Sequence, residues 1–76
     1  MKVVMITGQF CGYCEAAKHL LSVRGVEYKE ISAHEDEGMK IMKEHNLKTV
    51  PQIFINDELI GGYNDLQKWA LRDAGD

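Results

Sequence analysis

Two cysteines separated by two residues, just after a short apolar run, constrain this chain more than any other feature. Residues 3–6 are apolar and mostly β-branched, which favours a buried strand. Cys11 and Cys14 follow where a helix is expected to begin. The unpaired N–H groups and the positive end of a helix dipole favour an anion at that place, and a thiolate is an anion. We therefore expect the pKa of the Cys11 thiol to lie below that of a free cysteine.

Cys14 stands one helical turn after Cys11, within reach of a disulfide but inside the helix and less exposed. This arrangement suits thiol–disulfide exchange, with Cys11 as the attacking sulfur and Cys14 as the resolving sulfur. A purely structural disulfide is a weaker interpretation, because closing a loop of about four residues stabilises a fold by only about 2 kcal/mol. A zinc site is also weaker, because structural zinc normally takes four ligands and this motif supplies two. We therefore predict redox chemistry and no metal site.

Length and composition limit the class of protein. The 76 residues correspond to a single small domain, 1–76, near the lower limit for a self-sufficient core. The net charge is −3 and no basic stripe is present, which argues against a nucleic-acid partner. No apolar run is long enough to span a membrane, and no signal peptide is recognisable. Without a recognisable signal peptide we expect a cytoplasmic protein, and in that reducing compartment a lone Cys-x-x-Cys is more often catalytic than structural.

Hydrophobic periodicity and turn signals predict the remaining elements. Strands are expected over 2–7, 26–31, 51–55 and 58–60, and helices over 13–24 and within 32–46. A last helix is expected to be capped by Asn64 or Asp65. In the second helix, Met39 and Met42, with His45, are expected on the inner face. The order β-α-β-α-β-β-α needs a parallel pair first and an antiparallel hairpin last, so the predicted fold is α/β, a four-stranded mixed sheet with helices on both faces.

Three motifs in this order make the chain resemble a glutaredoxin, a member of the thioredoxin-like superfamily. The motifs are Cys11-Gly12-Tyr13-Cys14, Thr49-Val50-Pro51 and Gly61-Gly62-Tyr63-Asn64-Asp65. The resemblance covers nearly the whole chain. It implies the thioredoxin-like fold and a dithiol, glutathione-dependent thiol–disulfide oxidoreductase. It also implies that glutathione is a co-substrate and that the enzyme needs no bound cofactor.

The resemblance assigns roles outside the cysteine pair. It implies a cis peptide bond before Pro51, which turns the backbone of Val50 toward an extended, peptide-like substrate. It places the γ-glutamyl end of glutathione at the Gly-Gly corner and the start of the last helix, where N–H groups can bind a carboxylate. The glutathione-binding residues that it implies are Tyr13, Thr49, Val50, Pro51, Gly62, Tyr63 and Asn64. Without the resemblance, a trans proline and a plain tight turn with a helix cap remain alternatives.

Partners follow from the same resemblance. Clients are expected to be glutathionylated proteins and protein disulfides, such as that of a ribonucleotide reductase, and the protein is expected to act as a monomer. One alternative stays open at Gly12, where the commonest dithiol glutaredoxins carry proline. Some relatives with glycine there share a [2Fe–2S] cluster across a dimer, with glutathione thiolates completing the ligands.

A second alternative concerns the reductant. The stretch 8–10 lacks the lysine that many relatives carry before the cysteines, and Lys18 or Lys48 can replace that cation only in part. Asn64 stands where many relatives have aspartate, and a neutral hydrogen bond is about half as strong as a charged one. Both departures predict weaker glutathione binding, which leaves open a thioredoxin-like protein that is reduced by a flavoprotein reductase.

Overall fold

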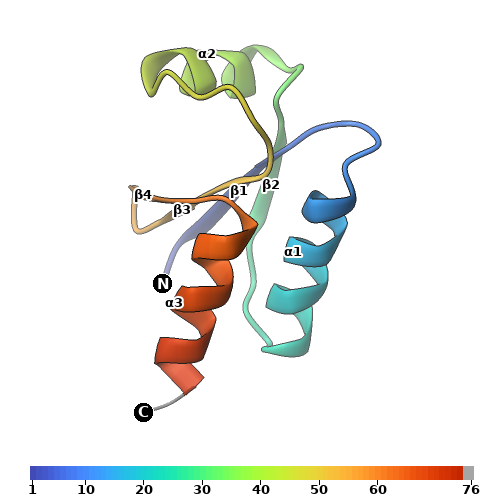
Figure 1. The fold of residues 1–76 in the computed structure, drawn as a ribbon. Helices are drawn as coiled ribbons and strands as arrows, with labels where there is room; N and C mark the ends of the chain where they lie inside the picture. The colour runs from blue at the N-terminus through green and yellow to red at the C-terminus, as the bar shows by residue number, and fades with distance from the viewer. Residues whose placement is uncertain (75–76) are drawn as a thin grey trace.

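The computed structural model describes residues 1–74 and confirms the predicted order of elements (Figure 1). The elements are β1 (Val3–Thr7), α1 (Gly12–Val23), β2 (Lys29–Ser32), α2 (Asp36–Glu44), β3 (Gln52–Ile55), β4 (Glu58–Gly61) and α3 (Tyr63–Ala74). The strands form one sheet in the order β2-β1-β3-β4. β1 pairs in parallel with β2 and antiparallel with β3, and β3 pairs antiparallel with β4. The mixed sheet of the thioredoxin-like fold is therefore present as predicted.

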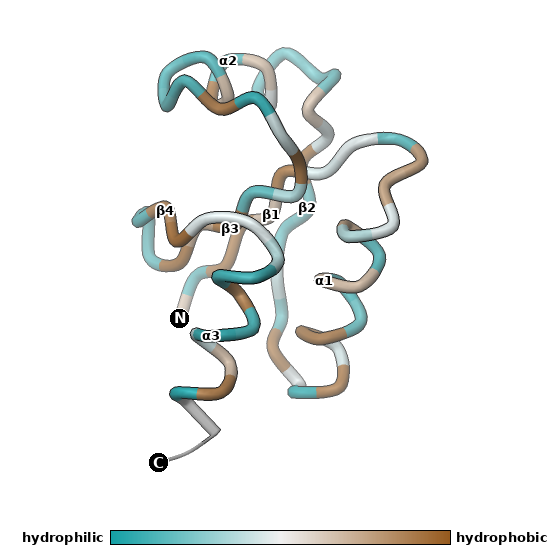
Figure 2. Tube along the Cα trace, in the orientation of Figure 1, coloured by the Kyte–Doolittle hydropathy of each residue, from teal (hydrophilic) through white to brown (hydrophobic). Residues whose placement is uncertain are grey.

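The sheet has a hydrophobic core on each face, because the side chains of β1 alternate between them. Val3 and Met5 pack with side chains of α1 and α3, whereas Ile6 packs with Ile31 and Phe54 beneath α2. Figure 1 shows α1 and α3 side by side, with α2 apart from them above the sheet, and Figure 2 shows the hydrophobic stretches in the strands between these layers. No helix in the described part of the chain is long and apolar enough to cross a membrane.

The second strand is shorter than predicted and begins later. Gly25 adopts a left-handed backbone with φ of 68°, and the N–H of Val26 donates to the carbonyl of Leu21 at 2.9 Å. This is the hydrogen-bond pattern of a Schellman helix end, which fits the expected stop at Gly25. The chain must then cross from the end of α1 to the sheet before it can pair with β1. Residues 26–28 make this crossing, and pairing starts only at Lys29.

The inner face of α2 differs from the prediction at Met39, which is half exposed at 50%. Gly38 is buried instead, with Ile41 and Met42 half-buried against the core. The three positions follow helical spacing from residue 38, which turns Met39 toward solvent. His45 also remains exposed, although its ring lies edge-on to Phe54 with centroids 5.1 Å apart. Close approach of the helix backbone to the sheet thus sets its rotation, and glycine permits that approach.

We predict that Gly38→Ala destabilises the fold. A Cβ at this position would lie 2.8 Å from the carbonyl carbon of Ser32 and 3.1 Å from the Cα of Ala33, and backbone atoms cannot move aside as a flexible side chain can. Forcing extra volume into a packed site costs about 1–3 kcal/mol. Urea unfolding followed by circular dichroism measures this loss.

Gly12→Ala is the matched control, because a Cβ there has no atom within 4 Å. Alanine is also the better helix former, so this variant should be as stable as the wild type or slightly more stable. Equal unfolding free energies for the two variants would contradict the packing argument.

Candidate active site

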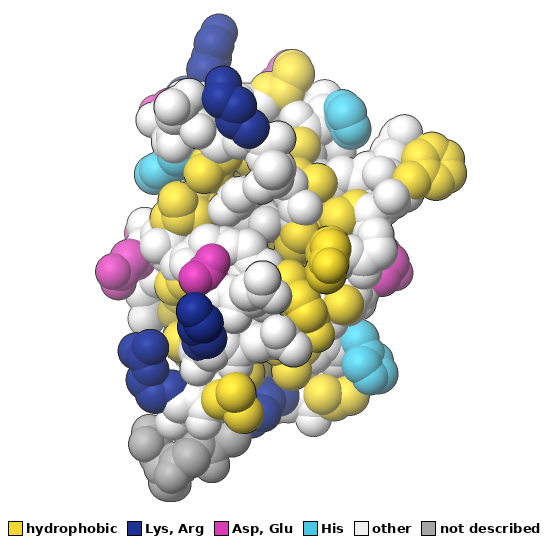
Figure 3. Space-filling model, viewed as in Figure 1, with side chains coloured by type: hydrophobic (Ala, Val, Ile, Leu, Met, Phe, Trp, Pro, Cys, Tyr) yellow, Lys and Arg dark blue, Asp and Glu magenta, His cyan; other side chains and the backbone are white. Residues whose placement is uncertain are grey.

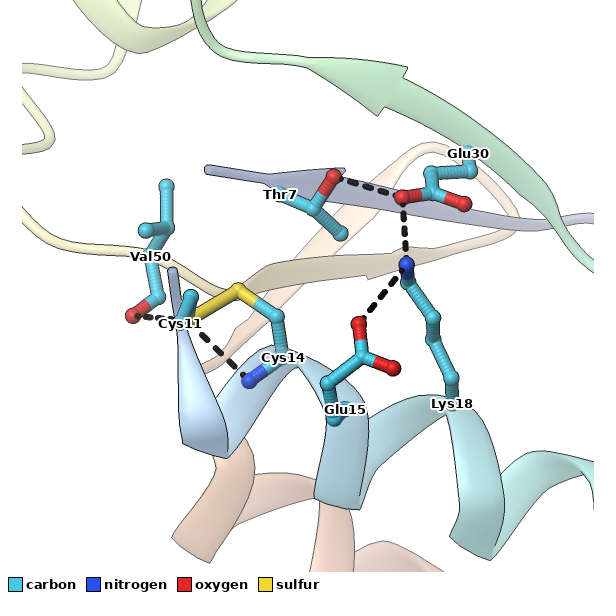
Figure 4. A network of polar contacts seen from close by, with 7 residues as sticks. All are labelled: Thr7, Cys11, Cys14, Glu15, Lys18, Glu30 and Val50. Carbon is cyan, nitrogen blue, oxygen red and sulfur yellow. Dashed lines mark hydrogen bonds and ion pairs between the residues drawn. A yellow bond between two sulfur atoms is a disulfide. The ribbon is translucent and has the colours of Figure 1, made fainter. Parts of the chain in front are cut away.

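The two cysteines differ in exposure and in backbone setting. Cys11 is the N-cap of α1, with an extended backbone at φ −112° and ψ 102°, and its sulfur accepts a hydrogen bond from the N–H of Cys14 at 3.1 Å. Cys14 lies within the helix and is only 1% exposed, whereas Cys11 is partly exposed. The two form a disulfide with Cα atoms 5.2 Å apart (Figure 4). The sulfur that is reached from solvent is therefore that of Cys11, as predicted.

The Thr49-Val50-Pro51 segment lies directly beside Cys11. The Val50–Pro51 peptide bond is cis, as the resemblance implied. The carbonyl oxygen of Val50 is 3.7 Å from the sulfur of Cys11, and Figure 4 shows the two side by side at the start of α1. A backbone segment before an antiparallel strand thus borders the reactive sulfur, where an extended substrate can reach it.

A groove of about 370 Å³ reaches the cysteine pair through Tyr13, which stands between the two cysteines, and Val50, whose carbonyl oxygen is 3.7 Å from the Cys11 sulfur. Its lining consists of Tyr13, Thr49, Val50, Pro51, Gly62, Tyr63 and Asn64. These are the seven residues that the resemblance implied for glutathione, and the structure brings them together from α1, the segment before β3, and the start of α3. The rings of Tyr13 and Tyr63 have centroids 5.8 Å apart. Figure 3 shows hydrophobic side chains gathered at the surface around the first turns of α1 and α3.

Comparisons with known proteins identify the family. The glutaredoxin family model matches residues 3–60. The chain belongs to the glutaredoxin family. Glutaredoxin 3 of Escherichia coli K12 is 41% identical over 75 residues, covering 96% of this chain and 88% of that protein. The protein is a thiol–disulfide oxidoreductase that acts through its Cys11–Cys14 pair.

Solved glutaredoxin structures share the fold over nearly the whole chain. The crystal structure of glutaredoxin 1 from Francisella tularensis, complexed with cacodylate, has a TM-score of 0.81 and 31% identity, and covers 99% of this chain and 98% of that one. The buckwheat glutaredoxin–glutathione complex has a TM-score of 0.76 and 27% identity, and covers 96% of this chain and 69% of that one. The fold of this chain is therefore the thioredoxin-like fold of glutaredoxins.

The start of α3 is capped differently from the prediction. The helix begins at Tyr63, so Asn64 and Asp65 both lie inside its first turn, and neither occupies the N-cap position. The carboxylate of Asp65 instead accepts a hydrogen bond from the N–H of Gly62 at 3.2 Å. An acid at the third helical position that binds back to the cap residue is one half of a capping box. Asp65 thereby fixes the Gly-Gly corner of the groove, while Asn64 remains exposed in its lining.

The sequence argument missed Gln52. Its side-chain nitrogen donates hydrogen bonds to the carbonyl oxygen of Thr49 at 3.0 Å and to the Thr49 hydroxyl at 3.2 Å. The available signal was a single amide at the start of an otherwise apolar strand, 52–55. The described residues contain no cluster of three or more His, Cys, Asp or Glu side chains able to hold a metal. The [2Fe–2S] alternative, which needs ligands from a second chain and from glutathione, stays a prediction.

Lys18 forms ion pairs with two carboxylates beside α1. Its ammonium lies 2.8 Å from Glu30 and 3.1 Å from Glu15, and Glu30 also accepts a hydrogen bond from Thr7 at 2.8 Å (Figure 4). Hydrogen bonds from Lys18 and then Thr7 lower the pKa of the Glu30 carboxyl below its ordinary value of 4.5. Hydrogen bonds with Glu30 and then Glu15 raise the pKa of Lys18 above 10.5. This cation therefore serves the packing of α1 against β2.

We predict that Lys18→Met lowers stability most near neutral pH. The Glu30 contribution is present above the ordinary carboxyl pKa of 4.5 and disappears as the pH falls through the lowered folded pKa. The Lys18 contribution is present below 10.5 and disappears as the pH rises through the raised folded pKa. Since Glu30 is 41% exposed, solvent screening limits the loss to about 1 kcal/mol. Urea unfolding in acid, at neutrality and in strong base measures the difference from wild type.

Lys40→Met is the control, because Lys40 is exposed on α2 and has no ion pair with the side chains described, those of residues 1–72. Its difference from wild type should change little with pH. A loss in Lys18→Met that persists undiminished at acid pH would show that the lysine stem, rather than its charge, provides the stability.

Proposed function

We propose that this glutaredoxin uses glutathione as its co-substrate, bound in the groove beside Cys11. The observation that carries the proposal is the groove itself, in which all seven residues implied by the family motifs meet next to the reactive sulfur. Support also comes from the buckwheat relative, whose structure is a complex with glutathione. A tripeptide fits such a site through backbone pairing with Val50 and through N–H groups at the start of α3.

The proposed reaction consists of two thiolate attacks. The Cys11 thiolate attacks one sulfur of the client disulfide, forming a mixed disulfide while the other sulfur leaves as a thiolate and takes a proton from water. The Cys14 thiolate, formed by loss of its proton to solvent, then attacks the Cys11 sulfur and releases the reduced client. When the client is a glutathione mixed disulfide, a glutathione thiolate can make the second attack instead. Two molecules of glutathione reduce the Cys11–Cys14 disulfide and leave as glutathione disulfide.

The partial exposure of Cys11 and the burial of Cys14 support this division of roles. An attacking sulfur must be reached by a disulfide in another molecule, and Cys11 is the exposed member of the pair. The N–H of Cys14 at 3.1 Å supplies a hydrogen bond to a Cys11 thiolate. Cys14, at 1% exposure, is shielded from a disulfide in another molecule but lies within bonding reach of the Cys11 sulfur, which it attacks in the resolving step. We further propose that the single domain acts as a monomer in the cytoplasm, where a glutathione pool can reduce it.

We predict that Cys11→Ser abolishes all reductase activity, because no other thiol is accessible for the first attack. Cys14→Ser should retain reduction of a glutathione mixed disulfide and lose most of the reduction of protein disulfides, which needs the resolving thiol. Coupled assays with glutathione, glutathione reductase and NADPH measure both activities.

These assays test the identity of the co-substrate and the roles of the two cysteines separately. Loss of both activities in Cys14→Ser would contradict the proposal that Cys11 alone suffices with glutathione. Absence of glutathione turnover in the wild type, together with reduction by a thioredoxin reductase, would refute glutathione as the co-substrate and establish the flavoprotein alternative.

Phe10 supports polypeptides as clients. This residue directly precedes Cys11, has a left-handed backbone with φ of 52°, and is fully exposed at 104%. An aromatic residue held in that conformation outside the core is uncommon. Phe10 is absent from the lining of the glutathione groove. It therefore lies where the chain of a bound client, rather than glutathione, can contact it.

We predict that Phe10→Ala raises the KM for a protein disulfide about fivefold, as expected for losing roughly 1 kcal/mol of apolar contact. The KM for a small glutathione mixed disulfide should change by less. Phe10→Leu should keep most of the contact, and Leu71→Ala is a control that removes an exposed apolar side chain from α3. Equal KM changes for both substrates in Phe10→Ala would contradict a client-specific contact.

A further inference from the structure

Gln52 is a buried polar residue whose side-chain nitrogen forms hydrogen bonds with a single neighbouring residue. It is the first residue of β3, stands opposite Ile6 of β1, and is only 7% exposed. A buried amide that lacks hydrogen-bond partners destabilises a fold, so its contacts usually have a specific purpose. Both contacts of its nitrogen go to one residue, Thr49, at the carbonyl oxygen and at the hydroxyl.

The chemistry of these two contacts fixes the orientation of the amide. The carbonyl oxygen of Thr49 can only accept a hydrogen bond, so the nitrogen of Gln52 must face it at 3.0 Å. The second hydrogen of that nitrogen then points at the Thr49 hydroxyl at 3.2 Å. The hydroxyl oxygen therefore acts as the acceptor in this pair, and its own hydrogen is left for another partner.

Thr49 lines the groove beside Cys11. Thr49 is exposed and forms part of the groove lining, and the next residue, Val50, has its carbonyl 3.7 Å from the Cys11 sulfur. No charged side chain lines this groove among the described residues. The side-chain donors that this groove offers to a ligand carbonyl or carboxylate are therefore neutral, and the Thr49 hydroxyl is one of them.

We propose that Gln52 is a positioning residue that holds the Thr49 hydroxyl as a hydrogen-bond donor to the peptide-like co-substrate. This inference rests on the proposed function, since it concerns the ligand of the same groove. Gln52 does not touch the ligand. It ties the start of the Thr49-Val50-Pro51 segment to β3, so that the hydroxyl and the Val50 carbonyl keep their places relative to Cys11.

A double-mutant cycle between positions 52 and 49 tests the proposal. Gln52→Met keeps the side-chain length and removes the donor. With the mixed disulfide of glutathione and 2-mercaptoethanol, it should raise KM about 3- to 10-fold, the loss expected from weakening one hydrogen bond, with kcat within about twofold. In a Thr49→Val background, the same substitution should change KM by less than about twofold, because the hydroxyl that Gln52 orients is absent. An unchanged KM in Gln52→Met, or the same rise in both backgrounds, would overturn the proposal.

A measurement on the wild-type protein keeps the test independent of activity and of variant stability. Nuclear magnetic resonance should show slow hydrogen exchange at the side-chain amide of Gln52. Gln9 is the internal reference, because its side chain is exposed and has no hydrogen-bond partner among the side chains of residues 1–72 or the backbone of residues 1–74. Equal exchange rates for the two amides would overturn the positioning role. Should the wild type fail to turn over with glutathione, the proposed co-substrate would be refuted, and this exchange measurement alone would decide whether Gln52 holds Thr49.

Discussion

The hydrogen bond from the N–H of Cys14 to the sulfur of Cys11 is the contact on which the chemistry of this molecule depends. It exists because Cys11 is the N-cap of α1, where backbone N–H groups have no partner within the helix. β1 determines where that helix begins. This strand has neighbours on both sides and packs against both hydrophobic cores, so its end is firmly placed. Because two strands and two hydrophobic cores hold β1, this strand positions the start of α1, and with it the reactive sulfur.

The antiparallel register of β3 explains why the other half of the site lies at the same edge of the sheet. Ile6, near the end of β1, pairs with Gln52 at the start of β3, so the segment before β3 emerges beside the loop that leads to Cys11. β4 then returns antiparallel, and Gly61 pairs with Ile53. The start of α3 is thereby brought to the same edge. Segments separated by about 40 residues in the sequence thus meet because strand pairing leaves their ends adjacent.

The sequence predicted the parts of the molecule that local patterns determine, and failed where packing decides. The strand–helix order, the Gly25 stop and the place of Cys11 follow from periodicity and helix-end chemistry. The exposure of Met39 does not, because the rotation of α2 depends on how closely Gly38 approaches the backbone of Ser32. Asp65 was expected as a cap, but its bond to the Gly62 N–H from inside the helix depends on where α3 begins. Gln52 was overlooked since only the folded chain shows that its amide turns back to Thr49.

The charge distribution around the site explains why the neutral hydrogen bonds between Gln52 and Thr49 matter. The cation of Lys18 is held by Glu30 and Glu15, and the groove itself is lined by uncharged side chains. A charged tripeptide bound there must be recognised through backbone N–H groups and through neutral side chains such as Thr49 and Asn64. Neutral hydrogen bonds are individually weak and depend steeply on geometry, so their donors must be oriented before the ligand arrives. Gln52 provides that orientation at Thr49 from a position that is buried, rigidly paired to β1 and two residues from the carbonyl that borders Cys11.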